Sequence, residues 1–130
     1  MSGPRNVLVL TLRLIAVATI VSGIIQLAAP SFVLGLVGGD ANPAALHFFG
    51  IVGMFMALFG VVMIVGLTPG VPRAPLLIAG LQKFGAAIAV ALGIWRGVFG
   101  AAAWPVAGFD LLTAILVAIH LARRSAPEGN

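Results

Sequence analysis

Four long apolar stretches constrain this chain more than any other feature of its sequence. The second of them runs from Ala44 to Leu67 without a charged residue, and His47 in its first turn is its one clearly polar side chain. A helix of about 20 such residues crosses the ~30 Å hydrocarbon core of a bilayer, at about 1.5 Å per residue. This stretch therefore predicts a membrane-spanning helix, against which we expect the others to pack.

The composition of the whole chain extends this prediction to the other three stretches. Of its 130 residues, 62% are hydrophobic and 8% are charged, whereas a soluble domain carries about 25% charged residues. Because so few polar residues cannot cover a water-facing surface, we predict an all-α integral membrane protein. It is expected to form one four-helix bundle domain over residues 1–130, with spans at about 7–29, 44–67, 76–95 and 104–122.

The connections between the spans are short. Pro30 is expected to end the first span. The apolar segment 31–39 is too short to cross a bilayer, so it should lie at the membrane interface or fold back on the bundle. Asp40, Asn42 and Pro43 predict a turn and a cap for the second span. Two further connections are expected at 68–75 and 96–103.

The distribution of basic residues predicts the orientation. Arg96 is the one basic residue on one predicted side of the bilayer, and that side also carries the acidic residue Asp40. The positive-inside rule therefore places the opposite side, and both termini, in the cytoplasm, with the tail 126–130 in water. No basic cluster with interleaved aromatic residues occurs, which argues against a nucleic-acid partner. The basic residues on the predicted cytoplasmic side are Arg5, Arg73, Arg123 and Arg124.

Small residues recur at helical spacing in the second and third spans. Such stripes let helix backbones approach closely in lipid, where association depends on packing. We expect the stripe of the second span to let the other helices of the bundle pack against it, and both stripes to serve packing with other membrane subunits or self-association. The stripes are Gly50, Gly53, Ala57 and Gly60 in the second span, and Gly85, Ala89 and Gly93 in the third.

Two cationic residues lie inside predicted spans, where each costs roughly 2.5–3.5 kcal/mol at the centre of the bilayer. Arg13 is in the first span and Lys83 in the third. One interpretation is that both extend their side chains to the cytoplasmic phosphate level. The other is a basic pocket that, with Gln82, holds an anionic head group, a quinone carbonyl or an acidic substrate.

Asp110 in the fourth span is the most informative polar residue. Its side chain should lean toward the outer end of its helix, where His47 and Gln26 are also expected. These three residues could form a polar cluster able to exchange a proton or hold a polar ligand group. The alternative is that Asp110 satisfies nearby loop backbone. A direct Asp110–Lys83 pair is a less favoured prediction than the cluster. Each side chain should lean toward the N-terminus of its own helix, and these two helix ends lie on opposite sides of the bilayer.

No catalytic or metal-binding motif accompanies these residues. The chain has no cysteine, which excludes disulfides and thiol redox chemistry. His47 and His120 are expected at opposite membrane faces, so one haem iron could not take both. No cofactor is therefore predicted, and an enzyme is less expected than a binding or structural protein.

The chain resembles the DoxX-like group of small bacterial four-helix membrane proteins. The resemblance rests on the end of the first span, with Gly23, Leu27 and Pro30, on the glycine-rich second span, and on Lys83 and Asp110 in the third and fourth. It implies a bacterial inner-membrane location. Because some members belong to quinone-linked oxidoreductase complexes, it also implies a possible link to quinone chemistry.

Two functions follow as expectations. The first is a non-catalytic accessory or scaffold subunit of a membrane complex, favoured by the short loops and the small-residue stripes. The alternative is a binder of a lipid or quinone-type molecule that uses the intramembrane polar residues. A small transporter is less favoured, because four-helix drug exporters use an acid in the first helix, where this chain has Arg13.

Overall fold

The computed structural model describes residues 3–125, and every regular element within them is a helix. Four of these helices are long and apolar enough to cross a membrane, close to the predicted spans. The predicted water-exposed tail, 126–130, lies outside the described residues. The elements are α1 (Pro4–Ala28), α2 (Pro30–Leu36), α3 (Pro43–Gly66), α4 (Ala74–Trp95), the 3-10 turn η1 (Ala101–Ala103) and α5 (Trp104–Ser125).

Proline and asparagine explain where the helices begin. Proline suits the first turn of a helix because the N–H it lacks has no partner there. The predicted cap of the second span is confirmed, since the Asn42 side-chain oxygen accepts a hydrogen bond from the Ala45 N–H at 2.9 Å. The segment after α1 folds into α2, which packs on α1 and α3. First-turn prolines are Pro4, Pro30, Pro43, Pro75 and Pro105.

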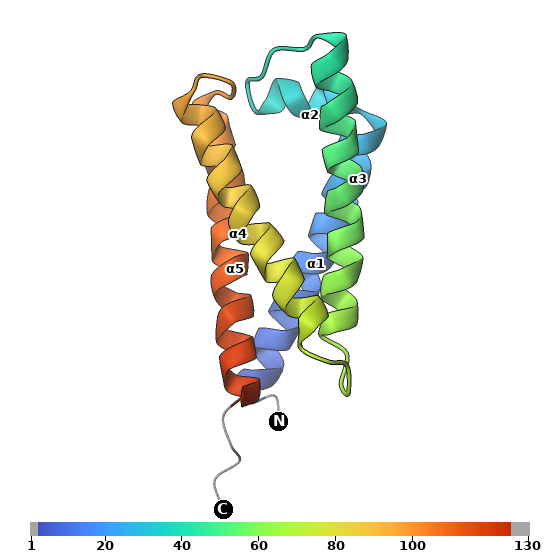
Figure 1. Ribbon diagram of the computed structural model, residues 1–130, viewed down its shortest axis with the longest axis vertical. Helices are drawn as coiled ribbons and strands as arrows, with labels where there is room; N and C mark the ends of the chain where they lie inside the picture. The colour runs from blue at the N-terminus through green and yellow to red at the C-terminus, as the bar shows by residue number, and fades with distance from the viewer. Residues whose placement is uncertain (1–2, 126–130) are drawn as a thin grey trace, which may run out of the picture.

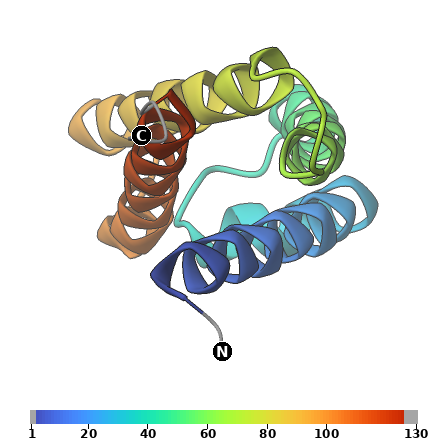
Figure 2. The same cartoon turned by 90° about the horizontal axis from the view of Figure 1, so that it is seen from below.

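The four long helices form a ring in the order α1, α3, α4, α5. Figure 2 shows them as the four sides of this ring, with α2 visible between them. The closest packing is within two pairs, α1 with α3 and α4 with α5. In Figure 1 these pairs diverge toward the end that carries α2, while α1 begins and α5 ends at the opposite end.

Glycines set the close approach of α1 to α3. A methyl group added at Gly53 would lie 2.7 Å from both the Gly23 carbonyl oxygen and the Leu27 nitrogen. One added at Gly60 would lie 2.5 Å from the Ile20 side chain. The stripe in the second span is therefore used inside this chain, against α1.

The stripe in the third span behaves differently. Gly85 has no atom within 4 Å of an added methyl group, so no neighbouring helix approaches it within the described residues. Gly93 faces the ring of Phe99 in the following loop. Ala89 is exposed. This stripe does not bring two helices of the chain together.

The end of the bundle where α1 begins and α5 ends has a packed core. Arg124 adds polar contacts there, because its guanidinium donates to the Gly66 carbonyl at 3.3 Å and to the Val71 carbonyl at 2.9 Å. These bonds satisfy carbonyl groups that the end of α3 and its loop leave free. The core consists of Leu12, Ala16, Met63, Leu67, Leu76, Ala79, Val117 and Leu121.

At the other end, the loop after α2 and the loop after α4 contact each other and so link the two helix pairs. α2 and α4 are each followed, two residues after the helix ends, by a glycine at positive φ, Gly38 at 70° and Gly97 at 71°, where a side chain would be strained. The Gly100 N–H then donates to the Val37 carbonyl at 2.8 Å. This bond links the α2 segment to the loop after α4, across the diverging end of the bundle.

We predict that Gly53→Leu lowers the stability of the fold by about 1–3 kcal/mol, because the side chain would have to separate two backbones in contact. Gly85→Leu is the matched control and should unfold close to the wild-type temperature, since its position is open. Thermal unfolding in mild detergent measures both. Equal loss of stability in the two variants would contradict the role given to Gly53.

Candidate functional site

Lys83 of α4 and Asp110 of α5 form a buried ion pair. Lys83 Nζ donates to Asp110 Oδ1 at 2.7 Å, and the two side chains are 5% and 9% exposed. The ammonium also lies 5.4 Å from the centre of the Phe109 ring, within the range of a cation–π contact. Two opposite charges therefore neutralise each other between the helices of one pair.

The prediction that ranked this pair second is wrong. It rested on the direction in which side chains lean along a helix. Removing a charged group from water without a partner costs more than a change of side-chain direction. The close packing of α4 on α5, where a methyl group on Gly80 would lie 2.7 Å from Val117, brings the two groups within reach. Lys83 also does not extend to the membrane surface, as one interpretation held.

The ion pair borders a cavity of about 680 Å³ between the two helix pairs. All five α-helices contribute to its wall, and Phe32, Val33 and Leu36 of α2 cover one side. The lining is apolar apart from a few side chains. These are Ser22 and Gln26 of α1, Gln82 and Lys83 of α4, and Asp110 of α5.

The two glutamines of the lining differ in their hydrogen bonds. Gln26 Nε2 donates to the Phe49 carbonyl at 2.8 Å, which ties α1 to α3 beside the cavity. Gln82 Oε1 is buried and has no hydrogen-bond partner within the described residues. A buried amide oxygen without a partner is costly, so a hydrogen bond to Gln82 Oε1 would stabilise the protein.

The predicted cluster of Asp110, His47 and Gln26 does not form. Gln26 and Asp110 line the same cavity, but His47 is exposed and packs edge-on against Phe48, with ring centres 5.8 Å apart. Arg13 is exposed as well and is not part of the lining, so it forms no common pocket with Lys83.

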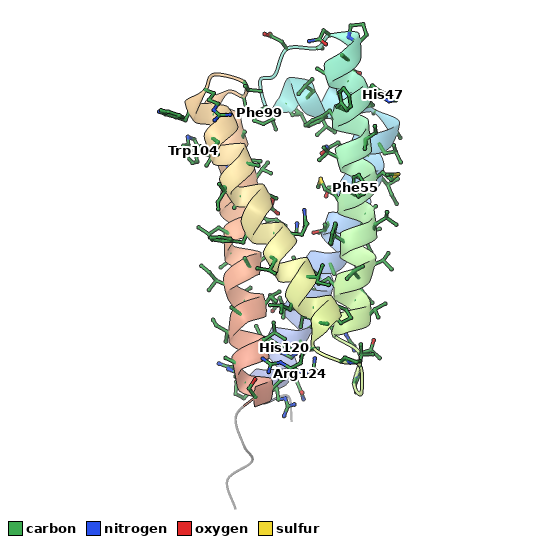
Figure 3. All side chains as sticks on the ribbon, in the orientation of Figure 1. His47, Phe55, Phe99, Trp104, His120 and Arg124 are labelled. Atoms are coloured by element: carbon green, nitrogen blue, oxygen red, sulfur yellow. The ribbon has the colours of Figure 1, made fainter. Side chains whose placement is uncertain are left out.

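The remaining histidine, His120, lies at the other end of the bundle. Figure 3 shows it beside Arg124, far along the helices from His47, Phe99 and Trp104. The two histidines therefore lie at opposite ends of the bundle, as predicted. Among residues 3–125 no group of three or more His, Asp or Glu side chains could hold a metal ion.

Ser22 and Phe109 also belong to the site, although the prediction from the sequence did not include them. Ser22 precedes Gln26 by one helical turn, so the two share a face of α1. Phe109 adjoins Asp110 in sequence, but it is one of eight phenylalanines and nothing in the sequence marks it.

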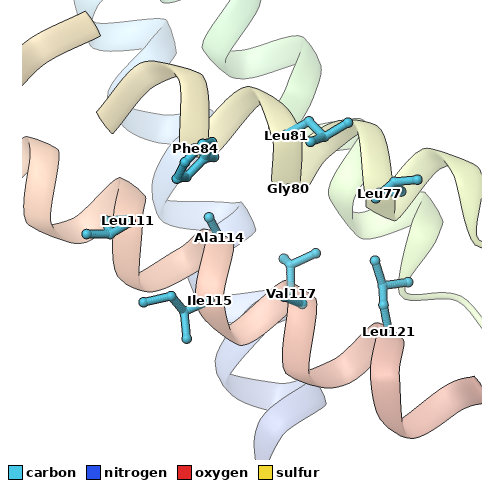
Figure 4. Close-up of a pocket in the computed structure, with 10 residues that line it drawn as sticks. Leu77, Gly80, Leu81, Phe84, Leu111, Ala114, Ile115, Val117 and Leu121 are labelled. Atoms are coloured by element: carbon cyan, nitrogen blue, oxygen red, sulfur yellow. The ribbon is translucent and has the colours of Figure 1, made fainter. Parts of the chain in front are cut away.

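A second hollow lies between α4 and α5 and has no polar lining. Its volume is about 280 Å³, and Figure 4 shows aliphatic and aromatic side chains around it. Lacking hydrogen-bonding groups, it can contact a hydrocarbon chain but offers no chemistry. Its lining is Leu77, Gly80, Leu81, Phe84, Leu111, Ala114, Ile115, Val117, Ala118 and Leu121.

Comparison with known proteins assigns no family to this chain. No protein-family model, curated protein or solved structure matches the chain.

We predict that Asp110→Ala destabilises the protein by about 3–5 kcal/mol, because it leaves Lys83 buried without its partner. The double variant Lys83→Met with Asp110→Leu should recover most of this loss, since no charge remains. Arg13→Met, at an exposed position, serves as the control with little effect. Thermal unfolding of these three variants and the wild type in the same detergent compares their stabilities, and a double variant no more stable than Asp110→Ala would show that the unpaired Lys83 charge does not cause the loss.

Proposed function

We propose that this protein binds an amphiphilic small molecule of the lipid or quinone type in the cavity between its helix pairs. The observation that carries the proposal is the cavity of about 680 Å³ with apolar walls around the buried Lys83–Asp110 pair. Small-molecule sites are concave and mostly apolar, span ~300–1,000 Å³, and carry a few polar groups that orient the ligand. This cavity has those properties.

The chemistry of the lining defines the shape of such a ligand. Its hydrocarbon or ring body would contact the apolar side chains of α2 and α3, including Phe32, Val52 and Met56. Its polar group would meet Lys83, Asp110 and Gln82, which together offer donors and acceptors. A quinone-type ring fits this description and agrees with the DoxX-like resemblance, although a hydroxylated lipid shares the same features.

We also propose that the protein lies in a bacterial inner membrane with both termini in the cytoplasm. Four helices suited to crossing a membrane support an insertion in which α1 begins and α5 ends on one side. Basic residues at that end favour the cytoplasmic side by the positive-inside rule.

Cysteine labelling tests this orientation, because the chain has no cysteine of its own. In intact cells, Asp40→Cys should react with a membrane-impermeant maleimide added outside. Ser125→Cys should react only after the membrane is opened. The reverse labelling pattern would invert the topology.

A bulky residue in the cavity wall tests the binding function. We predict that Ala89→Phe reduces the amount of co-purified amphiphile at least about tenfold, because the ring occupies cavity volume that a ligand needs. Ala18→Phe is the control, since Ala18 is exposed on α1 and does not line the cavity. Native mass spectrometry of gently extracted protein measures the bound mass. Equal occupancy in both variants would contradict binding in this cavity.

The accessory-subunit function is the second candidate. It is favoured by Gly85, where the small-residue stripe of α4 meets no other helix among the described residues. A partner helix could approach closely at this position. The same mass spectrometry would then show other polypeptides, and Gly85→Leu would remove them.

A further inference from the structure

We infer that the cavity selects amphiphiles whose polar head carries no net charge and rejects anionic and cationic ones of the same length. This inference rests on the proposed function and names its ligand class. It follows from the polar floor of the cavity, by which we mean the lining around Lys83 and Asp110. There one cationic and one anionic side chain are held at 2.7 Å from each other.

The ion pair is neutral as a whole. It remains so whether the shared proton resides on Lys83 Nζ or on the Asp110 carboxyl group. The other polar side chains of the lining, Ser22, Gln26 and Gln82, are uncharged. Arg13 is exposed and does not line the cavity, so no further charge of the lining compensates a ligand charge.

A charged head group would therefore be poorly accommodated. An anion bound to Lys83 would place a second negative charge beside Asp110, and a cation bound to Asp110 would approach the Lys83 ammonium. Like charges at close range in a medium of low dielectric constant repel strongly. Each would also lose its hydration on entering the cavity, without a counter-charge to replace it.

An uncharged hydroxyl or carbonyl group meets neither obstacle. Lys83 has donors beyond the one used by Asp110, and Gln82 can donate and accept. Such a head could hydrogen-bond to the pair without separating it. The polar floor thus discriminates by charge, while the apolar walls accept a range of hydrocarbon bodies.

Three probes with the same twelve-carbon chain test this selectivity. They are 1-dodecanol, 1-dodecanesulfonate and dodecyltrimethylammonium, the last two carrying a permanent charge. The wild-type protein in nanodiscs is incubated with labelled dodecanol, and each unlabelled probe is added as competitor, with empty nanodiscs as background. We expect the two charged probes to compete at least about tenfold more weakly than dodecanol.

Charge-altered variants test the cause of the selectivity. Asp110→Asn removes the negative member of the pair and should bind dodecanesulfonate at least about tenfold more tightly than the wild type. The double variant Lys83→Gln with Asp110→Asn is neutral again and should keep the preference for dodecanol. The wild-type comparison stands even if a variant does not fold.

The outcomes separate the inference from the function on which it rests. Equal competition by all three probes in the wild type would overturn the charge selectivity but leave binding intact. A folded Asp110→Asn protein with unchanged sulfonate affinity would overturn the role of the ion pair. If dodecanol does not bind the wild type above the empty-nanodisc background, and neither charged probe binds it directly, the proposed function fails.

Discussion

The burial of Lys83 against Asp110 is the constraint on which the arrangement of α4 and α5 depends. Burying either charged group alone would cost several kcal/mol, and each group lowers this cost by neutralising the charge of the other. The pair requires the two helices to present these positions to each other, and their close contact at Gly80 and Val117 allows it. The cation–π contact with Phe109 adds a third group to the same arrangement.

The bundle is asymmetric along its length, and this asymmetry creates the cavity. At one end a buried core and the Arg124 hydrogen bonds hold all four long helices together. Toward the α2 end the two pairs diverge, and α2 with the Val37–Gly100 hydrogen bond spans the space between them. Each pair is tight on its own, through Gly23 with Gly53 in one and Gly80 with Val117 in the other. The space therefore opens between pairs rather than within one.

The helices could be predicted from the sequence because hydropathy and length determine what can cross a bilayer, and proline and asparagine mark the starts. All four spans agree with the described helices to within a few residues, and the Asn42 cap is confirmed. The site was harder to predict. A sequence indicates the depth of a residue along its helix, but the neighbour that each face meets depends on how the helices pair. For that reason His47 and Asp110, expected together, lie apart, whereas Lys83 and Asp110 meet.

The same physics decides where specificity in such a cavity can come from. In a bilayer, lipid tails compete for every apolar surface, so apolar walls alone give a bound molecule little advantage over the surrounding lipid. Polar groups at membrane depth are different, because lipid tails offer them no hydrogen bonds. The Lys83 donors that Asp110 does not use can therefore donate a hydrogen bond to water or to a polar group in the cavity. For an amphiphile of the proposed kind, selection would therefore act through its polar head, and the charged groups that line the cavity are Lys83 and Asp110.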